Sequence, residues 1–435
     1  MTEAATSLGF REETFAAFLQ ARDEPAWLCD QRRAAWQEFA ALPMPSQRDE
    51  EWMRTDIRTF HLNHFGLPAD AAQTPLPDGL LTRGVELAGH TAALDSRSAA
   101  ASLRDKWAQR GVLFGSLDEL VAEHGDLVRK HLFSVINPSY DKFAALHAAA
   151  WSGGTLLYVP RGVVVDEPLH MLSVLSAGAS DLGHALVILD EGAEATLLAE
   201  SASLDHTAAG LHCGAVELIV GQGARLRYVN LQNWATGVWH FAHQKARVGA
   251  GGSLQWTIAA LGSRLAKVNQ HVALAGRDAT AQVNGVMFTE GKQHLSYHTL
   301  QHHEAPSCKS DLLYKIALQD HSRTVWRGMI KVDHEAQKTD GYQRADNLML
   351  SDNARSDSIP GLEILADDVR CTHGSTTGRV DDEQIFYARC RGLTRNEAVR
   401  MVVAGFFQQV FDRITIESVR EALGEAIGRR IREYD

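Results

Sequence analysis

Cys371 and His373 place a thiol and an imidazole two residues apart, within the stretch ADDVRCTHGSTTG (366–378). If this stretch is extended, residues i and i+2 point to the same face, so both side chains can reach one metal ion or cluster. Thiolate and imidazole are both ligands for iron and zinc. Two ligands do not complete a closed site, so three interpretations stay open: a metal-ligand pair, a redox thiol with a helping imidazole, and a turn holding a small buried cysteine.

A second group of candidate ligands lies in QHLSYHTLQHHEAPSC, where His294, His298 and His302 are spaced by four residues. Such residues share one face of a strand or a helix. His303 and Cys308 follow closely. The ordinary interpretation is a polar ladder and a turn, because the spacing matches no closed metal motif; the alternative is a second metal or sulfur-handling site.

Two motifs of hydrolytic enzymes are incomplete. His334 and Glu335 lack the second histidine of a zinc protease, since the required position holds Lys338. The segment 285–293 has one residue too many for a phosphate-binding loop, and no Ser or Thr follows Lys292. The sequence therefore contains no recognisable nucleotide-hydrolysing motif.

The region that must position these residues, from Gly153 to about Ile364, consists of short β-branched or alternating runs broken by Gly, Asp and Asn. A strand, a tight turn and a second strand recur, and repeats of this kind without crossover helices favour a β-solenoid over the alternative, a β-sandwich. The small residue after each turn recurs at intervals of about 26 to 43 residues: Ala193, Ala224, Ser253, Ala279, Ser322 and Ala354.

Helical periodicity flanks this region on both sides. The first part of the chain carries apolar residues at three- and four-residue spacing. After the β region, Asp381 is a candidate N-cap and Gly392 a candidate C-terminal stop, and Thr394 with Glu397 forms a capping box for the next helix.

The chain is therefore expected to divide into three parts: an N-terminal helical domain (1–152), a β-solenoid core (153–365) and a C-terminal helical domain (366–435). The Cys371/His373 stretch would then lie at the junction between the core and the last domain.

Charge, apolar runs and cysteine spacing limit the classes of function that the chain can have. The formal net charge of −11 argues against a nucleic-acid-binding protein, which needs a basic surface. The N-terminal stretch MTEAATSLGFREETF is not typical of a signal peptide, and no apolar run is long enough to span a membrane. The five cysteines contain no C-x-x-C pair, which fits reduced thiols. We expect a cytoplasmic protein that binds neither nucleic acid nor membrane.

Three stretches resemble the SufB/SufD family of iron–sulfur cluster assembly scaffolds: EEWMRTD (50–56), the segment 304–332, and above all residues 338–407. The last contains ADDVRCTHGSTTG followed by DDEQIFY (381–387), which is the pattern of the SufD type rather than of its SufB paralogue.

The resemblance implies a right-handed parallel β-helix flanked by N- and C-terminal helical domains. It also implies a non-catalytic scaffold that pairs with a SufB-type chain and binds a SufC-type ABC ATPase through its C-terminal helical domain. A nascent iron–sulfur cluster would form at the shared interface, so iron or a transient cluster is expected there and none in the isolated chain. Carried over to this sequence, His373 is the expected cluster or iron ligand and Cys371 the weaker neighbouring candidate.

Three alternatives remain at this point. The chain could act as a structural adaptor for the ATPase with Cys371 and His373 inert, or as a SufB-like scaffold that forms a homodimer when isolated. A β-helix enzyme acting on carbohydrates is the third, and it requires a carboxylate pair on the solenoid face.

Overall fold

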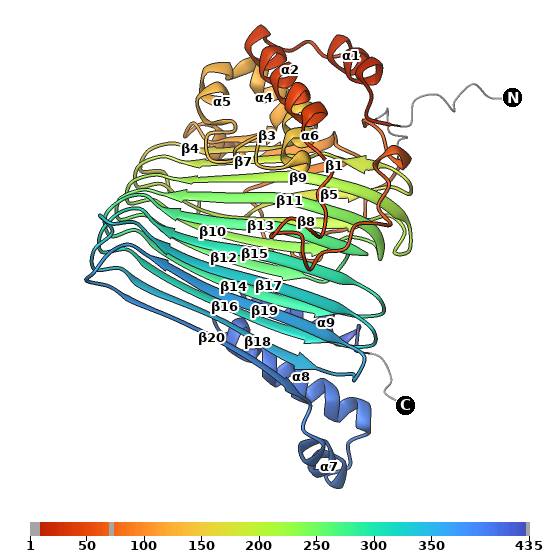
Figure 1. Cartoon of the computed structure of the whole chain (residues 1–435). Coiled ribbons are helices and arrows are strands. Elements are labelled where there is room, and N and C mark those ends of the chain that lie inside the picture. Colours follow the sequence, from red (N-terminus) through yellow and green to blue (C-terminus); the bar gives the residue numbers. More distant parts are fainter. Residues whose placement is uncertain (1–8, 69–73, 432–435) are drawn as a thin grey trace, which may run out of the picture.

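The computed structural model describes residues 9–68 and 74–431, which form a long stack of strands with helices near both ends (Figure 1). The first eight residues of MTEAATSLGFREETF, the stretch that is not typical of a signal peptide, lie outside the described residues. Within the described ranges, no helix is both long and apolar enough to cross a membrane.

The strands form two sheets, and the chain alternates between them as the stack grows. The first sheet has the order β2-β1-β5-β8-β10-β12-β14-β16-β18-β20, and the second β19-β17-β15-β13-β11-β9-β7-β4-β3. Neighbouring strands pair in parallel, except β1 with β2 and β3 with β4. The prediction of a parallel β-solenoid is confirmed, and the β-sandwich alternative is wrong.

The strands of the first sheet are β1 (Gly89–Leu94), β2 (Arg97–Leu103), β5 (Leu169–Leu175), β8 (Glu194–Ser203), β10 (Arg225–Asn233), β12 (Ser253–Ala260), β14 (Thr280–Thr289), β16 (Lys309–Leu318), β18 (Asp340–Met349) and β20 (Arg370–Arg379). Those of the second are β3 (Leu113–Ser116), β4 (Gly154–Val159), β7 (His184–Leu189), β9 (Ala209–Val220), β11 (Gly237–Val248), β13 (Leu265–Leu274), β15 (His294–His303), β17 (Arg323–Val332) and β19 (Arg355–Ile364), with the short β6 (Ser180–Asp181) beside β9.

The tight turns between strands explain the recurring sequence unit. Gly192 and Gly223 adopt φ values of +67° and +65°, in the left-handed region that glycine enters at little cost. Ala193 and Ala224, directly after them, are completely buried. A small residue is needed there because the chain re-enters the solenoid interior at that point.

Side chains at paired positions of parallel strands point to the same side, so the register creates continuous inward rows. Tyr228, Trp256 and Val283 form one such row across β10, β12 and β14, and all three are buried. Large aromatic residues thus fill the space between the two sheets.

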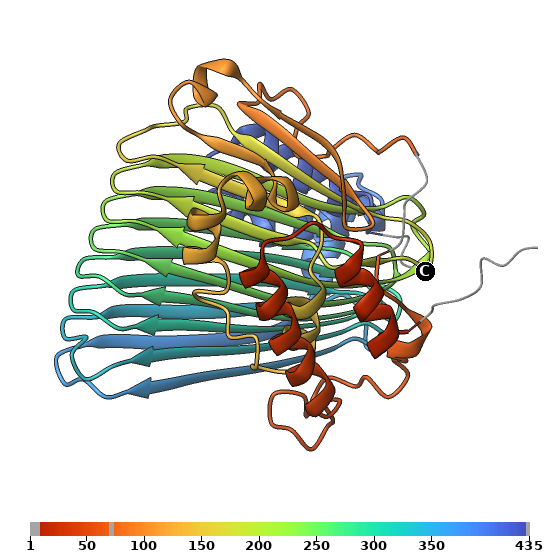
Figure 2. The same cartoon turned by 90° about the horizontal axis from the view of Figure 1, so that it is seen from above.

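The C-terminal helices are α7 (Asp382–Cys390), α8 (Arg395–Phe411) and α9 (Glu417–Gly428). Helices α8 and α9 cover the outer face of the first sheet (Figure 2), and α7 packs against α8. Val403 and Phe407 of α8 are fully buried in one cluster with Val286 and Leu313 of the sheet. The α8 helix is therefore fixed to the strands by an apolar contact.

The N-terminal helices cover the other side, over the first turns of the second sheet (Figure 2). They are α1 (Glu12–Gln20), α2 (Ala26–Ala41), the 3-10 helix η1 (Leu62–His64), α3 (Asp105–Ala108), α4 (Leu117–Glu123), α5 (Gly125–His131) and α6 (Lys142–Ala150). Phe143 of α6 stacks on Phe241 of β11 with ring centroids 3.8 Å apart.

Strands that join the two sheets also lie outside the expected solenoid core (153–365), on both sides of it. Strands β1, β2 and β3 lie within residues 1–152 and join the sheets, and β20 lies within residues 366–435. The expected helical character is wrong for β1, β2 and β3, because pairing with the solenoid, rather than their own weak alternation, makes them extended. The helical part at the C-terminus begins only at α7, and the division into three domains stays a prediction.

Candidate functional site

The last turn of the solenoid leaves two strand edges open (Figure 1). Strand β20 pairs with β18 and strand β19 with β17, and neither has a second neighbour among the described residues. Unpaired edges present rows of backbone N–H and C=O groups that can pair with another chain.

Cys371 and His373 lie on β20 and face the solenoid interior. They are the register partners of Gly341 and Gln343 on β18, and the Gln343 amide points inward, donating to the carbonyl oxygens of Gly328 and Gly361 on the opposite sheet. The stretch is therefore extended, and both side chains lie on one face of the strand.

The two side chains differ in exposure. Cys371 is half-buried beside Ile330, and burial raises the pKa of its thiol above the ordinary value. The thiol is therefore protonated at neutral pH, and a metal ion must displace that proton to bind it. His373 is exposed, since no further turn within the described residues covers the end of the interior.

Apolar side chains surround this pair at the open end. Leu362 and Ile364 of β19 are register partners of the buried Ile330 and Val332, so they too point inward, yet they are 38% and 37% exposed. Residues at the end of a stacked repeat usually carry a polar cap, and an uncapped apolar end indicates a contact surface. The alternation of Leu362, Glu363 and Ile364 is the short signal that could have identified these residues from the sequence.

No group of three or more His, Cys, Asp or Glu residues within 9–68 and 74–431 is arranged to hold a metal ion. The structure brings Cys371 and His373 to one face but adds no third or fourth ligand from the described part of the chain.

The histidines of β15 are held in separate contacts. His294, His298 and His302 share the outer face, as their spacing predicted, but His298 Nδ1 lies 2.8 Å from Lys267 Nζ and His302 Nε2 lies 3.0 Å from Asp333. Burial and the nearby Arg323 lower the pKa of His294 to about 4. The arrangement is that of a polar ladder.

The C-terminal helices carry a separate exposed patch, which the sequence analysis did not identify. Phe386 and Tyr387 of α7 are 67% and 62% exposed, and Met401 of α8 is 53% exposed. In Figure 1, α7 projects beyond the last strand of the solenoid. Large exposed apolar residues on two helices that contact each other indicate a protein-binding surface.

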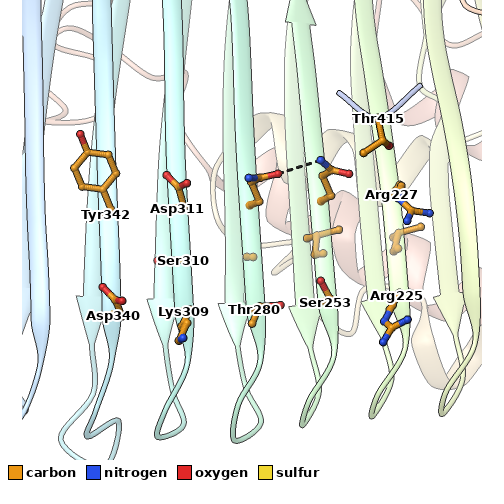
Figure 3. A pocket seen from close by; sticks show the side chains of 15 residues that line it. Arg225, Arg227, Ser253, Thr280, Lys309, Ser310, Asp311, Asp340, Tyr342 and Thr415 are labelled. Carbon is orange, nitrogen blue, oxygen red and sulfur yellow. Dashed lines mark hydrogen bonds between the residues drawn. The ribbon is translucent and has the colours of Figure 1, made fainter. Parts of the chain in front are cut away.

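A groove of about 670 Å³, lined by many polar side chains, runs over the outer face of the first sheet, beside the α8–α9 connection at Thr415 (Figure 3). Its outward rows contain Arg227 and Asp311, with a hydrogen bond of 3.0 Å between Gln255 and Gln282. By register these rows continue to the outward residues of β20, on the opposite face from Cys371 and His373. The groove is therefore separate from the candidate ligand pair.

The fold first defines a class: parallel β-solenoid proteins with helical regions at both ends. A family model described as "SUF system FeS cluster assembly, SufBD core domain" matches residues 173–406, and one described as "SufBD protein N-terminal region" matches residues 16–171. The chain belongs to the SufBD family of iron–sulfur cluster assembly proteins.

Named relatives agree with this assignment. An iron-sulfur cluster assembly SufBD family protein of Staphylococcus haemolyticus (strain JCSC1435) is 27% identical over 420 residues, which cover 94% of this chain and 90% of the relative. A protein of the same family name from Staphylococcus aureus (strain MRSA252) is 26% identical over 423 residues, with the same coverage.

Proposed function

We propose that this chain is a SufD-type scaffold subunit that supplies half of a cluster-assembly site at the open end of its solenoid. The observation that carries this proposal is the placement of Cys371 and His373 on the inward face of β20, an edge strand. A strand of a SufB-type partner beside this edge would bring its own side chains next to the pair.

The open edges and the apolar end support pairing with another chain. Leu362 and Ile364 would be buried by a partner that continues the stack, and the β20 backbone would gain hydrogen-bond partners. The partner in the proposal is a SufB-type chain; a second copy of this chain is the alternative.

The chemistry follows from the two side chains. Iron and sulfide are cargo here, and the exposed His373 imidazole can bind iron through a ring nitrogen. Cys371 must lose its proton to bind iron. Because burial raises the pKa of this thiol, it stays protonated until iron displaces the proton. A site with two ligands on each chain suits a cluster that has to be handed on, and the protein itself catalyses no step.

The energy source in this proposal is a SufC-type ABC ATPase bound to the C-terminal helices. The exposed Phe386, Tyr387 and Met401 supply an apolar docking surface for it. Binding and hydrolysis of ATP would move these helices and change the interface at the open end. If the ATPase binds but no cluster forms, the chain is a structural adaptor.

The test is anaerobic co-purification with SufB- and SufC-type partners, followed by measurement of bound iron and acid-labile sulfide. His373→Ala is expected to leave the complex assembled and to remove most of the iron and sulfide, with a smaller loss for Cys371→Ser. Thr372→Ala is the matched control, because Thr372 lies between the two residues and points to the other face. Unchanged iron and sulfide in His373→Ala would contradict the proposal.

A further inference from the structure

Asp346 of β18 gathers donors from three neighbouring strands on the outer face of the first sheet. Its carboxylate accepts hydrogen bonds from Lys315 Nζ of β16 at 2.7 Å, Arg344 Nε of β18 at 2.9 Å and Thr376 Oγ1 of β20 at 2.7 Å. Asp346 is 3% exposed. Burial raises its pKa, but the hydrogen bonds from Lys315, Arg344 and Thr376 outweigh this and keep the pKa below its ordinary value.

One end of this network touches the C-terminal helices. The Lys315 ammonium lies 4.8 Å from the ring centroid of Phe406 on α8, in cation–π geometry. Lys315 is buried, so its charge has two stabilising neighbours, the ring on one side and the Asp346 carboxylate on the other. A shift of α8 therefore changes the surroundings of Lys315 directly.

The other end holds the last turn. Thr376 belongs to β20, three residues after His373. On the inward face the next residue, Asn347, donates to the carbonyl oxygen of Thr376 at 2.9 Å and to Ser358 Oγ of β19 at 3.0 Å. The dipeptide 346–347 thus attaches both edge strands to β18, one from each side of the sheet.

We propose that Asp346 is a positioning residue that couples α8 to β20 and so sets the placement of Cys371 and His373. Phe406, Lys315, Asp346 and Thr376 form a continuous series of contacts from the helix to the edge strand. The inference deepens the proposed function and rests on it for its biological purpose, because it gives motion of the helices a physical route to the ligand pair.

The experiment is alkylation of Cys371 by iodoacetamide in the full chain, with rates read by peptide mass spectrometry and Cys390 as the internal reference. Cys371 is half-buried, so looser attachment of β20 exposes it and speeds its labelling. Thr376→Val, Asp346→Asn and Phe406→Leu are each expected to raise the rate, roughly two- to tenfold for members of one network. Thr376→Ser keeps the hydroxyl and is expected to retain the wild-type rate.

The labelling rates of double variants distinguish coupling between α8 and β20 from independent loosening of β20. The double variant Thr376→Val/Phe406→Leu is expected to label no faster than Thr376→Val alone, since the connection is already broken. The control is Lys331→Met, which removes the 3.1 Å ion pair with Glu363 between β17 and β19, on the sheet that α8 does not cover. Its effect is expected to multiply with that of Phe406→Leu.

A wild-type rate in Phe406→Leu, or fully multiplicative effects in the Thr376→Val/Phe406→Leu pair, would overturn the coupling. This pair decides the matter even if Asp346→Asn does not fold. The measurement needs no iron, sulfide or partner, so it is independent of the test of cluster assembly. The coupling through Asp346 can be wrong while the proposed function is right, and the reverse also holds.

Discussion

Gln343 and His373 are register partners on the last two strands of the first sheet, yet Gln343 is completely buried and His373 is exposed. The difference arises because β20 has no further neighbour in the described chain. In the described chain no strand follows β20 in the first sheet, so His373, which points inward, is accessible to a partner.

Charge at the open end is expected to weaken association. Ile364→Lys should reduce binding of a SufB-type partner about 10- to 100-fold, because burial of such a side chain contributes roughly 1.5–3 kcal/mol. The exposed position predicts little change in the stability of the isolated chain. The measurement is analytical ultracentrifugation of the mixed chains.

Leu204→Lys is the matched control for this surface, since Leu204 is 37% exposed, as Ile364 is, but follows β8 far from the open end. Equal weakening by both variants would show that the apolar end is not the contact surface.

The patch on the C-terminal helices is expected to bind the ATPase. Phe386→Ala and Tyr387→Ala should each weaken that complex by about 1–2 kcal/mol or more, as aromatic interface residues do. Calorimetric titration of the ATPase into the full chain measures the effect. Val164→Ala, at a 44% exposed position between β4 and β5, should bind as the wild type does. Wild-type affinity in both aromatic variants would place the ATPase elsewhere.

Two glycine substitutions are expected to act in opposite directions. Gly223→Ala places a side chain at φ +65° and should lower the free energy of unfolding by about 1–2 kcal/mol. Gly405→Ala lies in α8 with no atom within 4 Å of the added carbon, so it should raise helix stability by up to about 1 kcal/mol. Thermal denaturation and hydrogen exchange of α8 measure the two effects. Unchanged stability in Gly223→Ala would contradict the turn geometry, and a loss of helix stability in Gly405→Ala would contradict the open space at that position.

Lys267 is expected to make stability depend on pH. Burial lowers its pKa from 10.5 to about 7, so between these values the unfolded chain binds a proton that the folded chain does not. The lysine therefore costs stability at neutral pH, and its contribution to the free energy of unfolding becomes more favourable as pH rises from about 7 to about 10.5.

Lys267→Met tests this directly. The variant should lose that part of the pH dependence, as measured by urea unfolding across the range, because Met carries no titratable group. Lys292→Met, at an exposed turn, is the control and should keep the wild-type pH profile. Identical profiles for wild type and Lys267→Met would show that Lys267 does not titrate in this range.

The C-terminal helices and the solenoid repeats could be predicted because their signals are local. Asp381 accepts a hydrogen bond from the backbone N–H of Glu383, and Thr394 with Glu397 forms the expected capping box. Residues with left-handed backbone lie in the predicted turns before Ala193, Ala224, Ser253, Ala279 and Ser322. Each of these features depends on residues a few positions apart.

The remaining features depend on register, which single-sequence patterns do not report. Strand β2, RSAAASL, has no alternation of apolar and polar residues, and its extended form comes from pairing with β1. Lys315 and Asp346 are 31 residues apart and meet only because β16 and β18 align in one register. The sequence predicted that Cys371 and His373 share one face if the stretch is extended. That this face is the inward one follows only from the pairing of β20 with β18.

The most direct test of the central claim is pulsed electron paramagnetic resonance on the anaerobic complex, with ¹⁵N-histidine in this chain alone and the cluster reduced to its paramagnetic state. We predict a ¹⁵N coupling from a directly bound ring nitrogen that Thr372→Ala retains and His373→Ala removes. A cluster that forms at full occupancy with no histidine coupling from this chain would contradict the claim that β20 supplies half of the site.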